Sequence, residues 1–416
     1  MKKTAICLCA ILAVCVAAFA VYAVFIRSGN ESEYTPVPEI YQRETPPQNI
    51  VDEEPETPDK PETTTKPELP YEYEALPEPE EEPELVLPPI EEGQRSELPV
   101  NGATGWAATT LPLRDEPLDG AETVANLTPG QGFTILQEDG AWWQVRLGNG
   151  ETGWVEHRGC FINLPDIIPS IVYEKADTMS SPMRVTYIET ASDAGFPVHN
   201  VRVHNPRFDR YEFIVPVLYS MSGKIFDAQQ AALADGNTIV IVETFRPRAV
   251  QIRLVENLRY IMEHDEEVYN AINTPPWSLN WFVSTSVSHH QRGAAADATI
   301  GRIVSREIRK IGEFVYMQIT EFEEMSMPTA MHELVPAAAV FRYPVSSRST
   351  YAWRTATLAD TFTEDALLLQ RYFTDAGFTP LASEWWHFND LESVQIATEL
   401  GLTGEFFIET IYSVAP

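Results

Sequence analysis

The apolar positions of the chain first form a pattern of short strands. Residues 133–136 and 143–147 are compact β-type runs, a Gly-Asn-Gly turn signal follows at 148–150, and residues 153–155 begin another strand. Short strands joined by tight turns are typical of an all-β unit. The pattern therefore predicts a small β-barrel at residues 99–165.

Beyond the predicted barrel the pattern becomes mixed α and β. Residues 238–242 form an unbroken β-branched apolar run, as expected of a strand buried on both faces. Residues 249–264 carry apolar positions at helical spacing, with Pro247 expected in the first turn, and residues 363–376 form a second amphipathic helix. We therefore expect a domain of mixed α and β structure at residues 166–416.

The N-terminus carries one long apolar segment. Lys2 and Lys3 precede an uncharged run over residues 4–26, which is long enough to span a bilayer as a helix. We expect an uncleaved membrane anchor at residues 1–28, with the rest of the chain outside the cytoplasm. A cleaved signal peptide, which would make the protein secreted, is the alternative because small-residue sites such as Ala18-Phe19-Ala20 are present.

The acidic charge is concentrated after this segment. Residues 31–98 hold 21 acidic and 4 basic side chains, or −17 of the net charge of −32, and 14 of the 32 prolines. Such a segment has little to bury and repels itself, so residues 29–98 are predicted to be a disordered stalk. The remaining −15 argues against nucleic acid as a partner.

Cysteine usage constrains how the folded part is stabilised. Cys7, Cys9 and Cys15 lie in the apolar segment, which leaves Cys160 alone in the rest of the chain. An intrachain disulfide and a four-cysteine zinc site are therefore excluded outside the anchor, and burial of the core must hold the fold together.

The predicted barrel resembles the bacterial SH3-type domains of cell-wall enzymes. Three segments carry this resemblance: Leu-Pro-Leu-Arg-Asp-Glu-Pro at 111–117, Gly-Ala-Trp-Trp-Gln-Val at 140–145 and Gly-Glu-Thr-Gly-Trp-Val at 150–155. The resemblance implies binding to the cell wall. Trp143 and Trp154 are expected in the core, whereas Trp142, on the opposite face from Trp143, is the candidate ligand contact.

Two short segments carry candidate chemistry. His290 and Asp297 are seven residues apart, and the small residues between them allow a loop and the following strand to bring both side chains to one point. Glu384 and His387, three residues apart, can project together from a turn or helix. Two histidines and two carboxylates suit a catalytic zinc, which usually takes three protein ligands and leaves one position open. Each pair alone also has a bland explanation as surface or packing residues.

Taken together, these segments resemble the zinc D-Ala-D-Ala peptidases, the family of the vancomycin-resistance dipeptidases and carboxypeptidases. The resemblance runs from about residue 162 to the C-terminus, and the fold that it implies is an α+β domain whose central antiparallel sheet carries the zinc. Three ordered motifs carry it: Ser288, His290, Gly293, Ala295 and Asp297; Glu384 and His387; and Arg246, Pro247 and Gln251.

The resemblance implies one zinc ion per chain, bound by His290, Asp297 and His387. It also implies that Glu384 is the general base and that Arg246 stabilises the oxyanion of the intermediate. Ser288 and Gln251 are then expected to contact the substrate, with a structural cap as the alternative for Ser288.

The resemblance leaves the substrate open between a free dipeptide and a peptidoglycan stem peptide. The Glu-Trp-Trp-His-Phe sequence at 384–388 favours the dipeptidase branch, to which we give a slight preference. Where those dipeptidases have an aspartate for the ammonium of the dipeptide, this chain has His332, followed by Glu333, and both are candidate substrate-binding residues. An anchored, wall-binding enzyme favours a D,D-carboxypeptidase instead. Alternatives of another class are a wall-binding protein without activity and a hedgehog-like fold with a structural zinc.

Overall fold

The structure is a computed structural model that describes residues 85–173, 184–185, 188–189 and 202–416. The chain from residue 80 onward forms one compact unit. The predicted membrane anchor and residues 29–84 of the predicted stalk lie outside the described residues. Within the described ranges, no helix is both long enough and apolar enough to cross a membrane.

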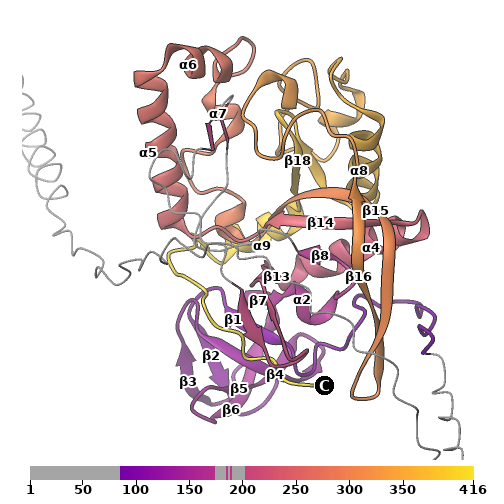
Figure 1. Ribbon diagram of the computed structural model, residues 1–416. Helices are drawn as coiled ribbons and strands as arrows, with labels where there is room; N and C mark the ends of the chain where they lie inside the picture. The colour runs from indigo at the N-terminus through magenta and orange to yellow at the C-terminus, as the bar shows by residue number, and fades with distance from the viewer. Residues whose placement is uncertain (1–84, 174–183, 186–187, 190–201) are drawn as a thin grey trace, which may run out of the picture. The chain divides into compact units, whose positions relative to one another are not determined.

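The predicted barrel is an antiparallel sheet of eight strands in the order β13-β7-β1-β4-β5-β6-β2-β3 (Figure 1). Its strands are β1 (Thr104–Ala107), β2 (Leu111–Arg114), β3 (Thr123–Leu127), β4 (Gly132–Asp139), β5 (Trp142–Leu147), β6 (Thr152–Glu156), β7 (Cys160–Asn163) and β13 (Pro216–Leu218). The 3-10 turn η1 (His157–Gly159) links β6 to β7. The three strand runs and the Gly-Asn-Gly turn predicted from the sequence are confirmed.

One strand of this sheet comes from the second folded region. β13 pairs with β7, with Val217 opposite Ile162, and the Leu218 amide then donates to the carbonyl of Gly293 over 2.8 Å. The barrel is therefore hydrogen-bonded to the segment that carries His290.

A six-stranded sheet forms the second region, in the order β17-β18-β15-β14-β8, with β16 also paired to β15. Its strands are β8 (Val172–Tyr173), β14 (Asn237–Glu243), β15 (Ala295–Ile311), β16 (Phe314–Glu324), β17 (Thr379–Leu381) and β18 (Glu384–Asn389). All of these pairs are antiparallel except β8 with β14, which is parallel. The predicted antiparallel sheet is thus confirmed apart from this short edge strand.

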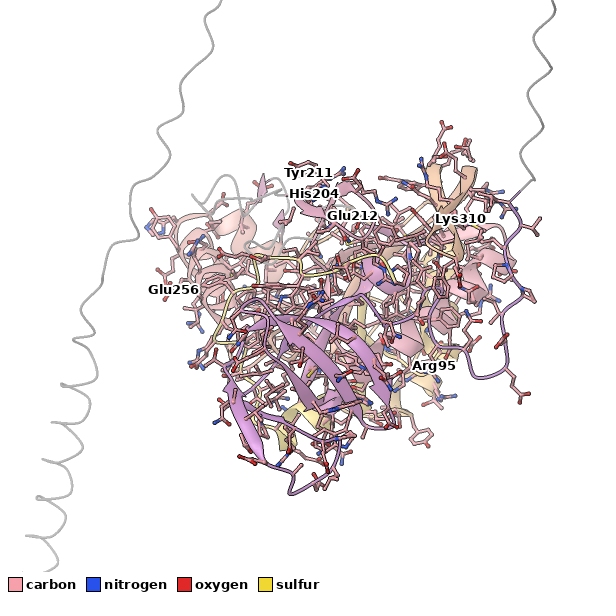
Figure 2. All side chains as sticks on the ribbon, turned by 90° about the horizontal axis from the view of Figure 1, so that it is seen from below. Arg95, His204, Tyr211, Glu212, Glu256 and Lys310 are labelled. Carbon is pink, nitrogen blue, oxygen red and sulfur yellow. The ribbon has the colours of Figure 1, made fainter. Side chains whose placement is uncertain are left out.

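Helices and short strands complete this region. The helices are α2 (Leu164–Ile167), α4 (Tyr219–Ala234), α5 (Arg248–His264), α6 (Glu266–Ile272), α7 (Leu279–Phe282), α8 (Glu364–Asp375) and α9 (Leu391–Glu399), with 3-10 turns η2 (His290–Arg292), η3 (Pro336–Ala338) and η4 (Ala352–Thr355). The remaining strands form two hairpins, β9 (Arg184–Val185) with β10 (Ile188–Glu189) and β11 (Val203–Asn205) with β12 (Arg210–Glu212). In Figure 2, His204 and Tyr211 are labelled on the β11–β12 pair, where their rings contact each other.

The predicted elements occur where the apolar pattern places them. Every residue of β14 is buried, as its unbroken apolar run implies. α5 begins at Arg248, so Pro247 is its N-cap residue rather than part of its first turn. α8 begins after Thr363, whose hydroxyl accepts a hydrogen bond from the Ala366 amide, as an N-cap should.

The C-terminal segment runs along the barrel in Figure 1. The Tyr412 amide donates to Thr104 Oγ1 over 2.9 Å, and the Val414 amide donates to the Gly102 carbonyl over 2.8 Å. Trp106 is 1% exposed, and its indole nitrogen donates to the Thr410 carbonyl. This face of the barrel is therefore occupied by the chain's own end.

The last residues of the predicted stalk are packed against the folded unit rather than extended. Leu98 is buried, and the Glu97 carboxylate accepts hydrogen bonds from Ser170 and Gln230. Arg95, labelled at the surface in Figure 2, forms a 3.6 Å ion pair with Asp227. The composition of the whole segment does not predict this packing, because a few residues at its end are enough to attach it to the folded unit.

Candidate metal centre

Three neighbouring strands align the acidic and histidine side chains of the site. Glu243 on β14 lies opposite Asp297 on β15, and Asp297 lies opposite His387 on β18. His290 comes from η2, which ends at Gly293 in a left-handed conformation with φ of 62°. The sharp turn returns the chain directly into β15, as the small residues between His290 and Asp297 predict.

Glu384 and His387 lie on strand β18, not on the turn or helix that their spacing suggests. Residues three apart on a regular strand point to opposite faces. The pairing with β17 is irregular here, because Pro380 is opposite Phe388 while the next residue, Leu381, is opposite Glu384. This bulge lets both side chains face the same site, with Glu384 Oε2 3.8 Å from His387 Nδ1.

Three donor atoms converge at the centre. Asp297 Oδ1 lies 2.9 Å from His387 Nδ1 and 3.4 Å from His290 Nε2, and the two nitrogens are 3.1 Å apart. Ligand atoms bound tetrahedrally at about 2.05 Å from zinc are about 3.3 Å apart. The three residues, all buried, therefore have the separations that one zinc ion requires.

The other nitrogen of each histidine is already used as a donor. His290 Nδ1 donates to the Thr244 carbonyl over 2.6 Å, and His387 Nε2 donates to Asn389 Oδ1 over 2.9 Å. In the neutral rings this leaves lone pairs on His290 Nε2 and His387 Nδ1, which face each other and a carboxylate oxygen. Such an arrangement favours a cation at the centre, and partners of this kind orient metal-binding histidines.

The charge state of Asp297 agrees with this arrangement. Burial alone would raise the pKa of Asp297, but the surrounding histidines, His290 above all, hold that pKa well below its usual range, so the carboxyl group is charged. Its second oxygen, Oδ2, lies 3.0 Å from His332 Nε2. Glu243, Asp297 and His332 form a second group with metal-ligand spacing. The guanidinium of Arg246 contacts both oxygens of Glu243. Arg246 therefore already supplies a positive charge to this second group.

Glu384 lies beside the donor triangle and is 1% exposed. Burial and the negative charge of Asp297 raise its pKa well above the usual value. Its Oε1 has no hydrogen-bond partner in the described part of the chain. A buried carboxylate with a free oxygen is suited to accept a proton from a group that binds in the pocket.

Arg246 is fixed by two neighbours. Glu243 raises its pKa although burial disfavours its charge, and Arg246 Nη1 donates to Gln251 Oε1 over 2.7 Å. Gln251 uses its other end to donate to the Ser284 carbonyl. Gln251 was expected to contact the substrate. In the structure, both the oxygen and the nitrogen of its side-chain amide have hydrogen-bond partners within the protein.

A cavity of about 310 Å³ opens onto this centre. Its walls include Arg246, Glu384 and both histidine ligands, together with residues 280–289 and 347–348. Ser288 lines it, and its hydroxyl also accepts a hydrogen bond from the backbone amide of Gln291 in η2 over 3.2 Å. His332 and Glu333, the two other expected substrate contacts, are not part of its wall.

Sequence reasoning missed several residues of the site. Asn389 is two positions after His387 on a strand, a spacing that puts both on one face and could have pointed to it. Its Oδ1 also accepts from His289 Nδ1 over 2.6 Å, and burial lowers the pKa of His289 to about 4. Arg348 lines the cavity from a loop that carries no local signal.

The barrel presents a partly exposed aromatic face away from its core. Trp143 is fully buried, as expected, but Trp154 is only partly buried, contrary to the expectation that it lies in the core. Trp154 on β6 lies opposite Gln144 on β5. Trp142 is two residues before Gln144 on the same strand, so Trp142 and Trp154 point to the same face of the sheet. The Arg114 guanidinium is 6.0 Å from the Trp142 ring centre.

Comparison with protein families agrees with both resemblances. Residues 215–400 match the family described as D-Ala-D-Ala dipeptidase, and residues 109–159 match the bacterial SH3 domain. No curated protein matches the chain. Together with the site, these matches indicate a metallopeptidase-type hydrolase whose barrel is similar to the bacterial SH3 domain. Its peptidase region is similar to the D-Ala-D-Ala dipeptidase family, as the sequence motifs predicted.

Proposed function

We propose that this chain is a zinc-dependent peptidase that hydrolyses D-Ala-D-Ala peptide bonds in cell-wall metabolism. The observation that carries the proposal is the convergence of three unprotonated donor atoms, on His290, Asp297 and His387, beside a buried carboxylate. Separations of 2.9–3.4 Å between these atoms suit zinc, as does a donor set of imidazole and carboxylate.

Each residue then has a chemical role. A zinc ion held by His290, Asp297 and His387 would act as a Lewis acid and would lower the pKa of a coordinated water toward about 7. Glu384, with one oxygen unpartnered, would accept a proton as water attacks the peptide carbonyl and would give it to the leaving amine nitrogen as the peptide C–N bond breaks. Arg246, held in place by Glu243 and Gln251, stabilises the negative charge that develops on the carbonyl oxygen.

The charges on the cavity wall favour a stem peptide over a free dipeptide, in contrast to the slight preference that the sequence gives. Two guanidinium groups, of Arg246 and Arg348, line the cavity and suit a C-terminal carboxylate. Among the described residues, Glu384 is the one carboxylate on that wall, so the ammonium of a free dipeptide would face only the proposed base. An acylated substrate has no ammonium there. We therefore favour D,D-carboxypeptidase activity, with the dipeptidase as the alternative.

The location of the enzyme is part of the proposal. The uncharged N-terminal segment would hold the chain at the cell membrane with the catalytic unit outside, and residues 29–84 would give it reach. The barrel would bind the wall through Trp142 and Trp154, because aromatic rings offer apolar contact area together with a polar nitrogen.

The substrate test compares two release reactions with one enzyme. The full-length protein, in mild detergent and loaded with zinc, is incubated with free D-Ala-D-Ala and with a muramyl pentapeptide ending in D-Ala-D-Ala. We expect D-Ala from the pentapeptide, and Glu384→Gln should reduce the rate about 10²–10⁴-fold while zinc binding persists. Cleavage of the dipeptide alone would establish the alternative. Zinc binding without cleavage of either would favour a wall-binding protein without activity.

Wall binding is tested separately by sedimentation with purified peptidoglycan. Trp142→Ala and Trp154→Ala should each lower the bound fraction without changing the turnover of a soluble substrate. Tyr211→Ala is the matched control, since Tyr211 is an exposed aromatic residue on the β11–β12 hairpin. Equal binding by all three variants would exclude this face of the barrel.

A further inference from the structure

His332 has a place in the structure that differs from the one its sequence position suggests. It is 1% exposed and does not line the cavity, so it does not meet a ligand there directly. Its Nε2 lies 3.0 Å from Asp297 Oδ2 instead. The residue therefore contacts the metal centre through Asp297 and not through the cavity.

The two oxygens of Asp297 have separate tasks. Oδ1 faces the nitrogens of His387 and His290, at 2.9 and 3.4 Å. Oδ2 accepts the hydrogen bond from His332 and is 3.9 Å from the Arg246 guanidinium. Because Oδ2 is engaged by the hydrogen bond from His332 and faces the charge of Arg246, Oδ1 is the oxygen directed at the centre.

The surroundings hold His332 in this position. Its backbone has φ of 62°, a left-handed conformation that is uncommon for residues other than glycine. Its ring packs edge-to-face on Trp386, with the ring centres 5.6 Å apart. Nδ1 has no hydrogen-bond partner within the described residues, so the tautomer with its proton on Nε2 leaves only a lone pair unsatisfied. A strained backbone of this kind persists where the packing around it fixes the conformation.

We propose that His332 is a positioning residue that holds Asp297 as a one-oxygen ligand of the metal. The inference rests on the proposed function only for the identity of the metal as zinc. Partners that orient a ligating side chain raise metal affinity about 10–100-fold. The chain thus uses this position for the metal centre, not for recognition of the substrate's amino end.

Two substitutions separate the hydrogen bond from the backbone conformation. His332→Asn tolerates the left-handed conformation, but its amide is too short to reach Asp297. His332→Gln places an amide nitrogen close to the position of Nε2 and can donate the bond. His264→Asn is the control, because His264 is exposed on α5 and its Nδ1 contacts only the Tyr260 carbonyl.

Zinc affinity of the full-length proteins is measured by competition with a chromophoric chelator, and Co²⁺-loaded samples report ligand geometry through their visible spectra. We expect His332→Asn to weaken zinc binding about 10–100-fold and to alter the Co²⁺ spectrum. His332→Gln should recover most of the affinity, and His264→Asn should match the wild type. The KM for the cleaved peptide should change little in any variant.

Unchanged zinc affinity in His332→Asn together with a raised KM would overturn the inference and assign His332 to the substrate. Equal losses in the Asn and Gln variants would also overturn it, because the donated bond would then not be the cause. If the wild-type protein binds zinc but releases no D-Ala, the proposed function fails, while the affinity comparison still decides the role of His332. Thermal unfolding of the zinc-free variants identifies any that do not fold. If His332→Asn does not fold, a loss of zinc affinity in a folded His332→Gln would still overturn the inference.

Discussion

Arg246 and Glu243 form a buried ion pair at the edge of the site, with side chains 3% and 1% exposed. Removing one member of such a pair leaves an uncompensated charge in the protein interior. The pair therefore contributes to folding as well as to the chemistry we propose, and a single substitution cannot separate the two contributions.

A double substitution can separate them. Arg246→Met should lower the free energy of unfolding by about 3–5 kcal/mol, because Glu243 loses its guanidinium. Adding Glu243→Gln removes that charge and should recover much of the stability. The turnover number should stay about 10²–10³-fold below wild type in both variants, since the oxyanion loses its cation. Denaturant titration and kcat on the pentapeptide measure the two effects, and recovery of kcat in the double variant would contradict the role of Arg246.

Glu97 offers a second prediction at this scale, away from the metal centre. Burial raises its pKa to about 7, although hydrogen bonds from Ser170 and Gln230 oppose this. The folded protein then binds the proton more tightly than the unfolded chain, whose pKa is 4.5. Folding stability should therefore fall by about 1–3 kcal/mol as the pH rises from about 4.5 to 7.

Comparison with Glu97→Gln isolates this contribution. The variant should gain stability relative to wild type as the pH rises through that range, as measured by denaturant titration at several pH values. Glu92→Gln, an exposed position on the same segment, is the matched control. A difference between Glu97→Gln and wild type that does not change with pH would contradict the prediction.

At the scale of elements, the turn after η2 connects the barrel to the metal ligands. Gly293 has φ of 62°, and a Cβ there would lie 2.6 Å from the ring of Phe161 on β7. That ring has no free space, because it packs on Phe245 and Phe406 and is fully buried. The position of His290 therefore depends on a side chain from the barrel.

Gly293→Ala should displace this turn and weaken zinc binding along with stability. Gly150→Ala is the matched control, since Gly150 also has positive φ but nothing within 4 Å of the added Cβ. In the control, the free energy of unfolding should fall only by the conformational cost of a side chain at positive φ, about 1–2 kcal/mol. Gly293→Ala should lose about 1–3 kcal/mol more from overpacking, measured by thermal unfolding and zinc competition. Equal effects of the two substitutions would show that Phe161 does not position the turn.

The elements that could be predicted from the sequence are those whose pattern of apolar residues lies within the element itself. The buried run of β14, the helices α5 and α8 and the strands of the barrel each have a periodic pattern of their own, and the structure confirms them. The ligand motif was visible for the same reason, because a short loop joins His290 to Asp297.

Features that depend on distant residues were not visible. The pairing of β13 with β7 and the C-terminal segment across Trp106 join parts of the chain that are far apart in sequence. The spacing of Glu384 and His387 suggested a turn or helix, since the bulge opposite Pro380 becomes apparent only when β17 pairs with β18. Long-range pairing of this kind has no signature in a local window of sequence.

At the scale of the whole molecule, these connections make the barrel part of the peptidase fold rather than an appended module. Without the barrel, β13 would lose its partner, the turn at Gly293 would lose Phe161, and residues 410–414 would lose the backbone and side-chain partners on β1 and β4. A chain of residues 166–416 should therefore lack a cooperative unfolding transition and bind zinc weakly. A chain of residues 85–416 keeps every described contact and should unfold at the same temperature as the full-length protein. Calorimetry and zinc competition on the two truncated proteins check this, and a cooperative, zinc-binding 166–416 fragment would show instead that the barrel serves only to bind the wall.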